Sequence, residues 1–182
     1  MQPSVFSAKL QATLGPKVLG REEHGGSDLL VVEASALTEA VRLLMSDAEL
    51  AFDILMDLGG ADYSGYPTEH AAPICVSYQF YSTRHNSRAW LKVYLPLEGP
   101  EVESLVPLFA GANWYERECF DMYGVNFKGH PYLKRLLLYD EFVGYPLRKD
   151  YPIMKSQPLI PMRNAVDYEA VAIKRRIEEG KA

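Results

Sequence analysis

Two neighbouring segments that alternate between apolar and other side chains constrain this fold most. ICVSYQFYS covers 74–82 and RAWLKVYLPL covers 88–97, and only TRHNS separates them. A period of two places every second side chain on one face of a β-strand, and a polar connection this short suits a hairpin loop. We therefore expect an antiparallel strand pair whose second strand buries Ala89, Leu91, Val93, Leu95 and Leu97.

The segments before this hairpin predict both helices and strands. In the first fifteen residues, apolar side chains at four-residue spacing favour a short amphipathic helix: Phe6, Leu10 and Leu14. The segment 28–33, DLLVVE, is typical of a strand, and Ser35 is placed to cap a helix that buries one face, formed by Leu37, Val41 and Leu44. The segment 50–58 predicts a strand with one apolar face, Leu50, Phe52, Ile54, Met56 and Leu58, and the following GGADYSGYP indicates a loop.

Two more helices are expected after the hairpin. Apolar residues at helical spacing follow Pro100, namely Val102, Leu105, Val106 and Phe109. In the next helix, Asn113 and Glu116 fit a capping box, and Gly124 fits the left-handed position that ends a helix. Arg117 and Asp121 are four residues apart and are expected to pair across one turn, opposite Tyr115, Cys119 and Met122.

Regular periodicity fades after Gly124. Prolines recur from position 131 to 161, so long helices and central strands are excluded there, yet the stretch is too rich in aromatic and aliphatic residues to be a flexible linker. We expect an α+β fold with helices packed on a small, mostly antiparallel sheet, followed by a long extended C-terminal arm. The expected parts are a head domain at 1–124, an aromatic, basic docking arm at 125–165, and a tail at 166–182 with a possible short helix.

Charge divides along the same boundary. The segment 1–124 holds 8 Lys and Arg against 17 Asp and Glu, whereas 125–165 holds 7 against 3. A basic arm on an acidic head points to a contact with another molecule, and folding back onto the head is the simpler alternative.

Several protein classes are excluded by the rest of the composition. At 182 residues the chain suits one ordinary domain, and its 48% apolar content is that of a folded protein. No uncharged apolar run reaches the roughly 18 to 20 residues needed to span a bilayer as a helix, and the N-terminus resembles neither a signal nor a transit peptide. The two cysteines, Cys75 and Cys119, form no CxxC pair, so a zinc or iron–sulfur site built from this chain alone is not expected.

Residues 113–138 concentrate the side chains that could carry chemistry. A metal or general acid–base site could combine His130 with Glu118 or Asp121, but the helical di-metal and HExxH patterns are absent. Cys119 as a nucleophile is disfavoured by the surrounding carboxylates, and neither phosphate-binding loops nor nucleic-acid modules are present. Aromatics interleaved with Arg, Lys and Asp in an irregular arm favour a permanent protein interface.

The run YERECFDMYGVNFKGHPYLKRLLLYDEFVGYPLRKDYP, residues 115–152, resembles the signature of the C subunit of proton-pumping NADH:quinone oxidoreductase, respiratory complex I. One departure is Tyr145, which stands where many members have histidine. The residues that carry the resemblance, and that we expect to form the interface, are Glu116, Arg117, Glu118, Asp121, Tyr123, Gly124, Phe127, Gly129, His130, Pro131, Arg135, Gly144, Pro146, Leu147, Arg148, Lys149, Asp150, Tyr151 and Pro152. Met122, Leu136 and Leu137 also match the motif.

The resemblance implies a protein without an active site and without a flavin, iron–sulfur cluster or metal of its own. FMN, iron–sulfur clusters and quinone would then lie on partner subunits, and the partners in contact with this chain would chiefly be the D and B subunits, with no nucleic acid. It implies a peripheral position on the cytoplasmic side of the bacterial inner membrane, which this chain would reach only through its partners in the complex. The open alternative is the equivalent subunit of a membrane-bound hydrogenase or another electron-input relative, and a free-standing enzyme using His130 is a third reading.

Two local roles follow from this reading. Arg148, Lys149 and Asp150 would make charge-assisted contacts with neighbouring subunits and so fix the arm. The charged residues of the preceding helix, Glu116, Arg117, Glu118 and Asp121, would hold the helix from which the arm begins.

Overall fold

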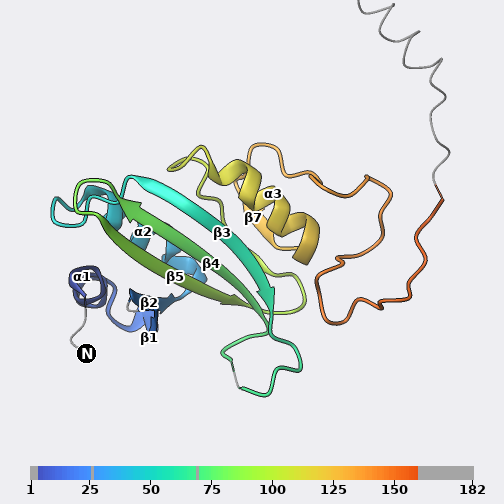
Figure 1. Cartoon of the computed structure of the whole chain (residues 1–182), viewed down its shortest axis with the longest axis horizontal. Helices are drawn as coiled ribbons and strands as arrows, with labels where there is room; N and C mark the ends of the chain where they lie inside the picture. Colours follow the sequence, from blue (N-terminus) through green and yellow to red (C-terminus); the bar gives the residue numbers. More distant parts are fainter. Residues whose placement is uncertain (1–3, 26, 69, 160–182) are drawn as a thin grey trace, which may run out of the picture.

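The computed structural model describes residues 4–25, 27–68 and 70–159, and it confirms the α+β fold (Figure 1). In chain order the helices and strands are α1 Val5–Leu14, β1 Val18–His24, β2 Ser27–Val32, α2 Leu37–Ser46, β3 Ile54–Asp62, β4 Ile74–Ser82, β5 Ser87–Leu95, β6 Glu101–Glu103, α3 Ala112–Tyr123 and β7 Asn126–Lys128. Short 3-10 turns at Gly15–Lys17 and Ala34–Ala36 precede β1 and α2.

One five-stranded sheet, in the order β1-β2-β5-β4-β3, organises the head. The predicted hairpin is confirmed: β4 and β5 pair antiparallel from Ile74 opposite Leu95 to Ser82 opposite Ser87. All other neighbours are antiparallel except β2 and β5, which run parallel because α2, β3 and β4 intervene between them in the chain. The short strands β6 and β7 form a separate parallel pair.

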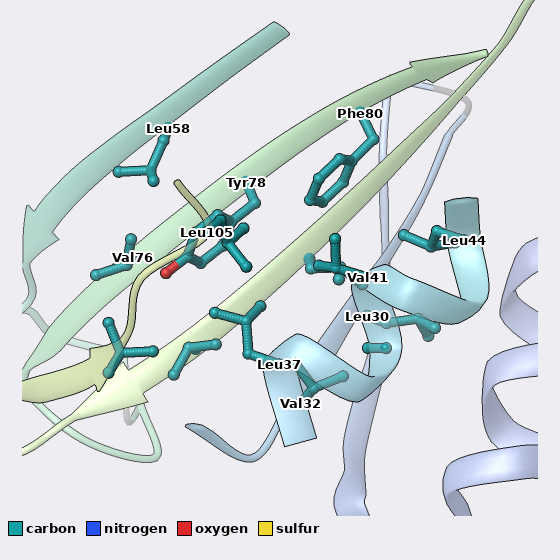
Figure 2. Packing of buried hydrophobic residues seen from close by; sticks show 14 of the residues in the cluster. Leu30, Val32, Leu37, Val41, Leu44, Leu58, Val76, Tyr78, Phe80 and Leu105 are labelled. Atoms are coloured by element: carbon teal, nitrogen blue, oxygen red, sulfur yellow. The ribbon is translucent and has the colours of Figure 1, made fainter. Parts of the chain in front are cut away.

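Helices α2 and α3 contribute to a core on one face of the sheet. The predicted apolar face of α2 is confirmed, since Leu37, Val41 and Leu44 are fully buried opposite Val76, Tyr78 and Phe80 of β4 (Figure 2). At Gly60 of β3, a Cβ atom would lie 2.5 Å from the ring of Tyr123 and 2.9 Å from Sγ of Cys119. The close approach of α3 to β3 therefore requires glycine at this position.

The first predicted helix is also confirmed, because α1 buries Phe6, Leu10 and Leu14. The ring of Phe6 packs edge-on against Phe52 with 6.2 Å between the ring centroids. Strand β1 was not expected, since its sequence VLGREEH carries three charges and lies at the edge of the sheet. An edge strand is half solvated, so it needs no apolar face.

Residues 50–58 differ from the predicted alternation. Leu50, Phe52 and Leu58 are buried, but Ile54 and Met56 are each 42% exposed. The register of β3 against β4 shifts between Leu55 and Asp57, which marks a β-bulge. One extra residue reverses the faces of the residues before it, so Leu55 packs against the core where Ile54 and Met56 were expected.

Three other local predictions are wrong. The expected loop from 59 begins late because Gly59 to Asp62 still pair in β3. The expected helix over 102–109 is strand β6 followed by a single turn from Leu105 to Phe109, since parallel pairing with β7 uses residues 101–103 and Pro107 lacks the N–H a longer helix needs. Ser35 caps no helix, because the residue before α2 is Ala36 and the Ser35 hydroxyl donates to Glu33.

Regular structure ends at Lys128, and residues 129–159 contain neither helix nor strand. This stretch runs past α3 and then away from the sheet (Figure 1). Within the described ranges, no helix combines the length and apolarity needed to cross a membrane. The tail at 166–182, with its predicted short helix, lies outside the described residues.

Candidate functional site: the root of the arm

The root of the arm, residues 130–151, is attached to the head through one buried carboxylate. Asp121 of α3 is fully buried, and its Oδ2 accepts three consecutive backbone N–H groups, from Leu136 at 3.0 Å, Leu137 at 2.8 Å and Leu138 at 2.9 Å. Its Oδ1 accepts from Nη1 of Arg135 at 2.7 Å. Burial alone would raise the pKa of Asp121, but these hydrogen bonds outweigh it and hold the pKa below its usual value.

Arg135 joins three segments of the chain. Besides Asp121, its guanidinium donates from Nη2 to the carbonyls of Phe142 at 2.9 Å and Gly144 at 3.1 Å. It also lies over the rings of Phe142 and Tyr145, at 5.7 and 5.6 Å from their centroids. A planar group with five donors suits this bridging role, which a lysine could not fill.

The end of α3 shapes the seat for the arm. Gly124 has the predicted left-handed conformation, with φ of 75°, so the prediction of a helix stop is confirmed. A Cβ atom at Gly124 would lie 2.5 Å from the ring of Tyr145. The backbone N–H of Leu147 then donates to the carbonyl of Met122 at 3.2 Å. Glycine thus allows both the turn and the close packing of the returning arm.

Arg148 and Lys149 contact the head rather than pointing away from it. The guanidinium of Arg148 donates to the carbonyl of Leu97, and its side chain is 11% exposed. The backbone N–H of Lys149 donates to Oδ2 of Asp62 at 2.7 Å, while the side chains of Lys149 and Asp150 are exposed. Arg148 therefore fixes the arm to its own chain. Oδ1 of Asp150 lies 3.6 Å from Nε of Arg148, and both Asp150 and Lys149 keep exposed side chains that a neighbouring molecule could contact.

Glu116 is not part of a capping box. Helix α3 begins after Gly111 without a side-chain cap, and Glu116 is fully buried. Its carboxylate accepts from the hydroxyl of Ser104 and the backbone N–H of Leu105, each at 2.6 Å. Burial raises the pKa of Glu116 to about 7, although these hydrogen bonds oppose the rise. Glu116 therefore anchors the turn after β6.

The predicted pairing of Arg117 with Asp121 is also wrong. Arg135 and three backbone N–H groups occupy Asp121, as described above. Arg117 instead donates to the carbonyls of Lys134 and Arg135, each at 3.0 Å, and lies over the rings of Trp114 and Tyr132. The helix holds the start of the arm with two arginine–carbonyl contacts.

The residues proposed for catalysis do not form a reactive group. His130 Nε2 contacts the carbonyl of Asn113 in α3 at 3.2 Å, and its Nδ1 accepts from the backbone N–H of Tyr132 at 2.9 Å, so both ring nitrogens have partners within the chain. Glu118 is exposed. Burial raises the pKa of the Cys119 thiol, which disfavours a nucleophilic thiolate. Among the described residues, no three His, Cys, Asp or Glu side chains gather as metal ligands would.

The remaining residues of the motif have mixed environments. Phe127 is buried in β7, while Tyr123, Gly144, Pro146 and Tyr151 are partly buried. The ring of Tyr151 stacks on that of Phe142 with 6.0 Å between the centroids. The exposed motif residues on the arm are Gly129, Pro131, Leu137, Leu147, Lys149, Asp150 and Pro152.

The arm carries an unusual number of exposed apolar side chains. Of the fifteen large hydrophobic residues that are exposed in the described structure, eight lie in the arm: Tyr132, Leu137, Tyr139, Val143, Leu147, Ile153, Met154 and Leu159. Three of these are almost fully solvated, with Ile153 at 98%, Met154 at 92% and Leu159 at 100%. Exposed apolar surface in this amount on one segment is typical of interaction sites.

Sequence reasoning did not find several partners of this site. Ser104, Asp62 and Leu97 contact the motif from distant segments, and no local pattern identifies them. Tyr145 could be singled out from the sequence, because it stands where many members of the family have histidine. In the structure its ring lies between the guanidinium groups of Arg135 and Arg148 and against Gly124.

Comparison with known proteins agrees with this geometry. A family model described as "Respiratory-chain NADH dehydrogenase, 30 Kd subunit" matches residues 30–157. The C subunit of NADH-quinone oxidoreductase from Burkholderia ambifaria is 39% identical over 177 residues, covering 94% of this chain and 88% of that protein. The protein of the same name from Ralstonia pickettii is 36% identical over 178 residues, covering 95% and 89%.

Solved structures show the same fold. A structure of "Nqo5 of the trypsin-resistant fragment (1-134)" aligns with a TM-score of 0.61 and 28% identity, covering 69% of this chain and 97% of the fragment. A chain of the archaeal membrane-bound sulfane sulfur reductase aligns with a TM-score of 0.61 and 21% identity, covering 81% of this chain and 84% of that chain. Because the family model and the relatives cover most of the sequence, the chain belongs to the family of the 30 kDa subunit of respiratory-chain NADH dehydrogenase.

Proposed function

We propose that this chain is a peripheral-arm component of proton-translocating NADH:quinone oxidoreductase that supports assembly of the quinone-reducing module by docking on the D and B subunits. The relatives from Burkholderia and Ralstonia, both named as the C subunit of NADH-quinone oxidoreductase, support the complex. The enzyme activity belongs to the assembly, and no active site is assigned to this chain. FMN, iron–sulfur clusters and quinone are assigned to the partners.

The observation that carries this proposal is an arm that is fixed at its root and exposes apolar side chains both along the root and beyond it. Hydrogen bonds that are partly buried hold residues 135–149 against the head, and they are made by Asp121, Arg135, Arg148 and Asp62. A root already held in place loses less conformational entropy on binding than a free segment would. The exposed apolar residues of the arm then supply the contact area, which a partner protein would cover.

The proposed location follows from the complex. We place the chain peripherally on the cytoplasmic side of a bacterial inner membrane, held there by its partners. Electron transport from NADH to quinone and proton translocation are properties of the whole assembly in this proposal.

The alternative is the equivalent subunit of a membrane-bound hydrogenase or another electron-input relative of the complex. Its support is the similarity in fold to a chain of the archaeal sulfane sulfur reductase. Nickel in the purified assembly, or an assembly that does not oxidise NADH, would select this alternative. The identities of 36 to 39% to C subunits of NADH-quinone oxidoreductase favour the first proposal.

A pull-down tests the proposal. The tagged chain would be recovered from gently solubilised membranes, with the co-eluting proteins identified and NADH oxidation by a quinone measured. We expect cluster-bearing subunits, the D subunit and the activity to elute together. Recovery of the chain alone would overturn the proposal.

A matched pair of variants locates the contact. Ile153→Ser combined with Met154→Ser replaces two almost fully solvated apolar residues of the arm, so folding should not change while partner recovery falls. Val5→Ser is the control, because Val5 is a 58% exposed apolar residue at the other end of the molecule. Equal losses for both variants would contradict docking through the arm.

A further inference from the structure

A solvent-exposed group of alternating aromatic and cationic side chains lies where α3 meets the start of the arm. We call it the cation–π cluster, and it consists of Trp114, Arg117, Tyr132 and Lys134. The guanidinium carbon of Arg117 lies 5.3 Å from the ring centroid of Trp114 and 5.5 Å from that of Tyr132. Nζ of Lys134 lies 4.9 Å from the centroid of Tyr132.

The two rings are exposed although they are large. Trp114 is 62% exposed and Tyr132 is 55% exposed. Neither ring belongs to the apolar core of the head. Trp, Tyr and Arg are the residue types most enriched at the energetic centres of protein interfaces, and exposed rings of this size add large contact area at low conformational cost.

The cluster is held in a fixed arrangement before any partner binds. Arg117 donates from Nε to the carbonyl of Lys134 and from Nη2 to the carbonyl of Arg135, both at 3.0 Å. The backbone N–H of Tyr132 donates to His130, which in turn contacts Asn113. A guanidinium has five N–H donors. Among the described residues, no hydrogen bond uses Nη1 of Arg117, so its N–H groups can donate to a further acceptor on a partner.

The charge of the cluster selects an anionic ligand. Arg117 and Lys134 both lie over the ring of Tyr132, so two positive charges repel each other across one aromatic side chain. Asp121 is committed to Arg135 and does not neutralise them. Glu118, which follows Arg117 in α3, is exposed and has no ion pair among the described residues. A carboxylate placed between Arg117 and Lys134 would relieve this repulsion and accept charge-assisted hydrogen bonds.

We propose that the cation–π cluster is a second docking point, which receives an Asp or Glu side chain from an acidic segment of a neighbouring protein in the complex while Trp114 and Tyr132 cover the apolar part of that segment. This inference rests on the proposed function, because it requires that the chain work inside a complex. The partner is defined by its chemistry, a protein segment with a carboxylate beside apolar side chains.

Photo-crosslinking in the assembled complex tests the placement. Trp114 would be replaced by benzoylphenylalanine in the tagged chain, the purified complex irradiated, and the crosslinked peptide sequenced. We expect a peptide of another protein of the complex, with Asp or Glu within a few residues of the crosslink. Crosslinks confined to this chain, to lipid, or to a peptide without acidic residues would overturn the inference.

Charge reversal tests the chemistry. Lys134→Glu should lower the amount of the neighbouring protein recovered with the chain by about fivefold at moderate salt, since a favourable charge contact becomes repulsive. Replacing the crosslinked carboxylate by lysine in the partner should restore recovery. The control is Arg84→Glu, which reverses an exposed cation in the turn between β4 and β5.

The outcomes separate this inference from the proposed function. If Lys134→Glu and Arg84→Glu recover the same amount while the unmodified chain recovers the whole complex, the second docking point is wrong and the proposed function stands. If the unmodified chain recovers no other protein of the complex, the proposed function itself fails.

Discussion

Asp121→Asn should release the root of the arm while leaving the head folded. The amide keeps one acceptor oxygen and replaces the other by an NH2 group. If the oxygen continues to accept from the three N–H groups of residues 136–138, the NH2 group faces the guanidinium of Arg135, where donor opposes donor. Arg135 then loses its carboxylate partner with its side chain only 15% exposed.

The magnitude follows from this burial. Removing one member of a buried ion pair costs about 3 to 5 kcal/mol, and because Arg135 keeps the carbonyls of Phe142 and Gly144, we expect about 3 kcal/mol. The loss in global stability cannot exceed the free energy with which the root docks on the head, so local opening is the better readout. A change of about 3 kcal/mol raises the open population by on the order of 100-fold.

Limited trypsin digestion measures that opening, because cleavage after Arg135 requires the released arm. We expect cleavage at Arg135 to accelerate by on the order of 100-fold in Asp121→Asn, if reclosing is fast relative to cleavage. Asp140→Asn is the matched control, since Asp140 is an exposed carboxylate on the same arm, and it should change stability by no more than about 0.5 kcal/mol. Similar digestion rates for both variants would refute the role assigned to Asp121.

Two further predictions concern α3. The folded-state pKa of Glu116, about 7, lies above the ordinary value of 4.5, so the folded chain binds the proton more tightly and stability should fall as pH rises from 4.5 to 7. Glu116→Gln should remove that fall in the free energy of unfolding, which is of the order of 3 kcal/mol. Denaturant unfolding of both proteins at pH 5 and pH 8 measures it. If the variant keeps the same dependence of stability on pH, the burial argument is wrong. Gly124→Ala should destabilise more than Gly129→Ala, because both have φ above 70° but only Gly124 has the Tyr145 ring within 4 Å of the new Cβ atom. Thermal melting compares the two, and equal losses would mean that the contact with Tyr145 is unimportant.

Local sequence patterns predicted those parts of the fold that local interactions determine. The apolar faces of α1 and α2, the strand β2 and the hairpin of β4 and β5 follow from periodicity and a short turn. The bulge in β3 could not be predicted, because the apolar alternation of residues 50–58 looks the same whether or not the backbone bulges. Strand β6 depends on pairing with β7, more than twenty residues later, so its own sequence looked helical.

The site was predictable to a similar degree. Gly124 ends α3 as expected because helix stops depend on neighbouring backbone alone. The pairing of Asp121 was misassigned, since the four-residue rule describes solvated helix surfaces and this carboxylate is buried by residues that follow the helix. Glu116 was also misassigned, because this carboxylate is buried too and its partners, Ser104 and Leu105, lie outside the helix, in the segment before it.

Amide hydrogen exchange of the chain, alone and within the purified complex, tests the central claim most directly. The account predicts that peptides from 152–159, the part of the arm beyond its root, exchange quickly in the isolated chain and slowly in the complex, because partner proteins cover the exposed side chains of Ile153, Met154 and Leu159. Peptides from β4 and β5 should exchange slowly in both samples. If the arm exchanges at the same rate in the complex as in the isolated chain, it is not a docking surface and the account is wrong.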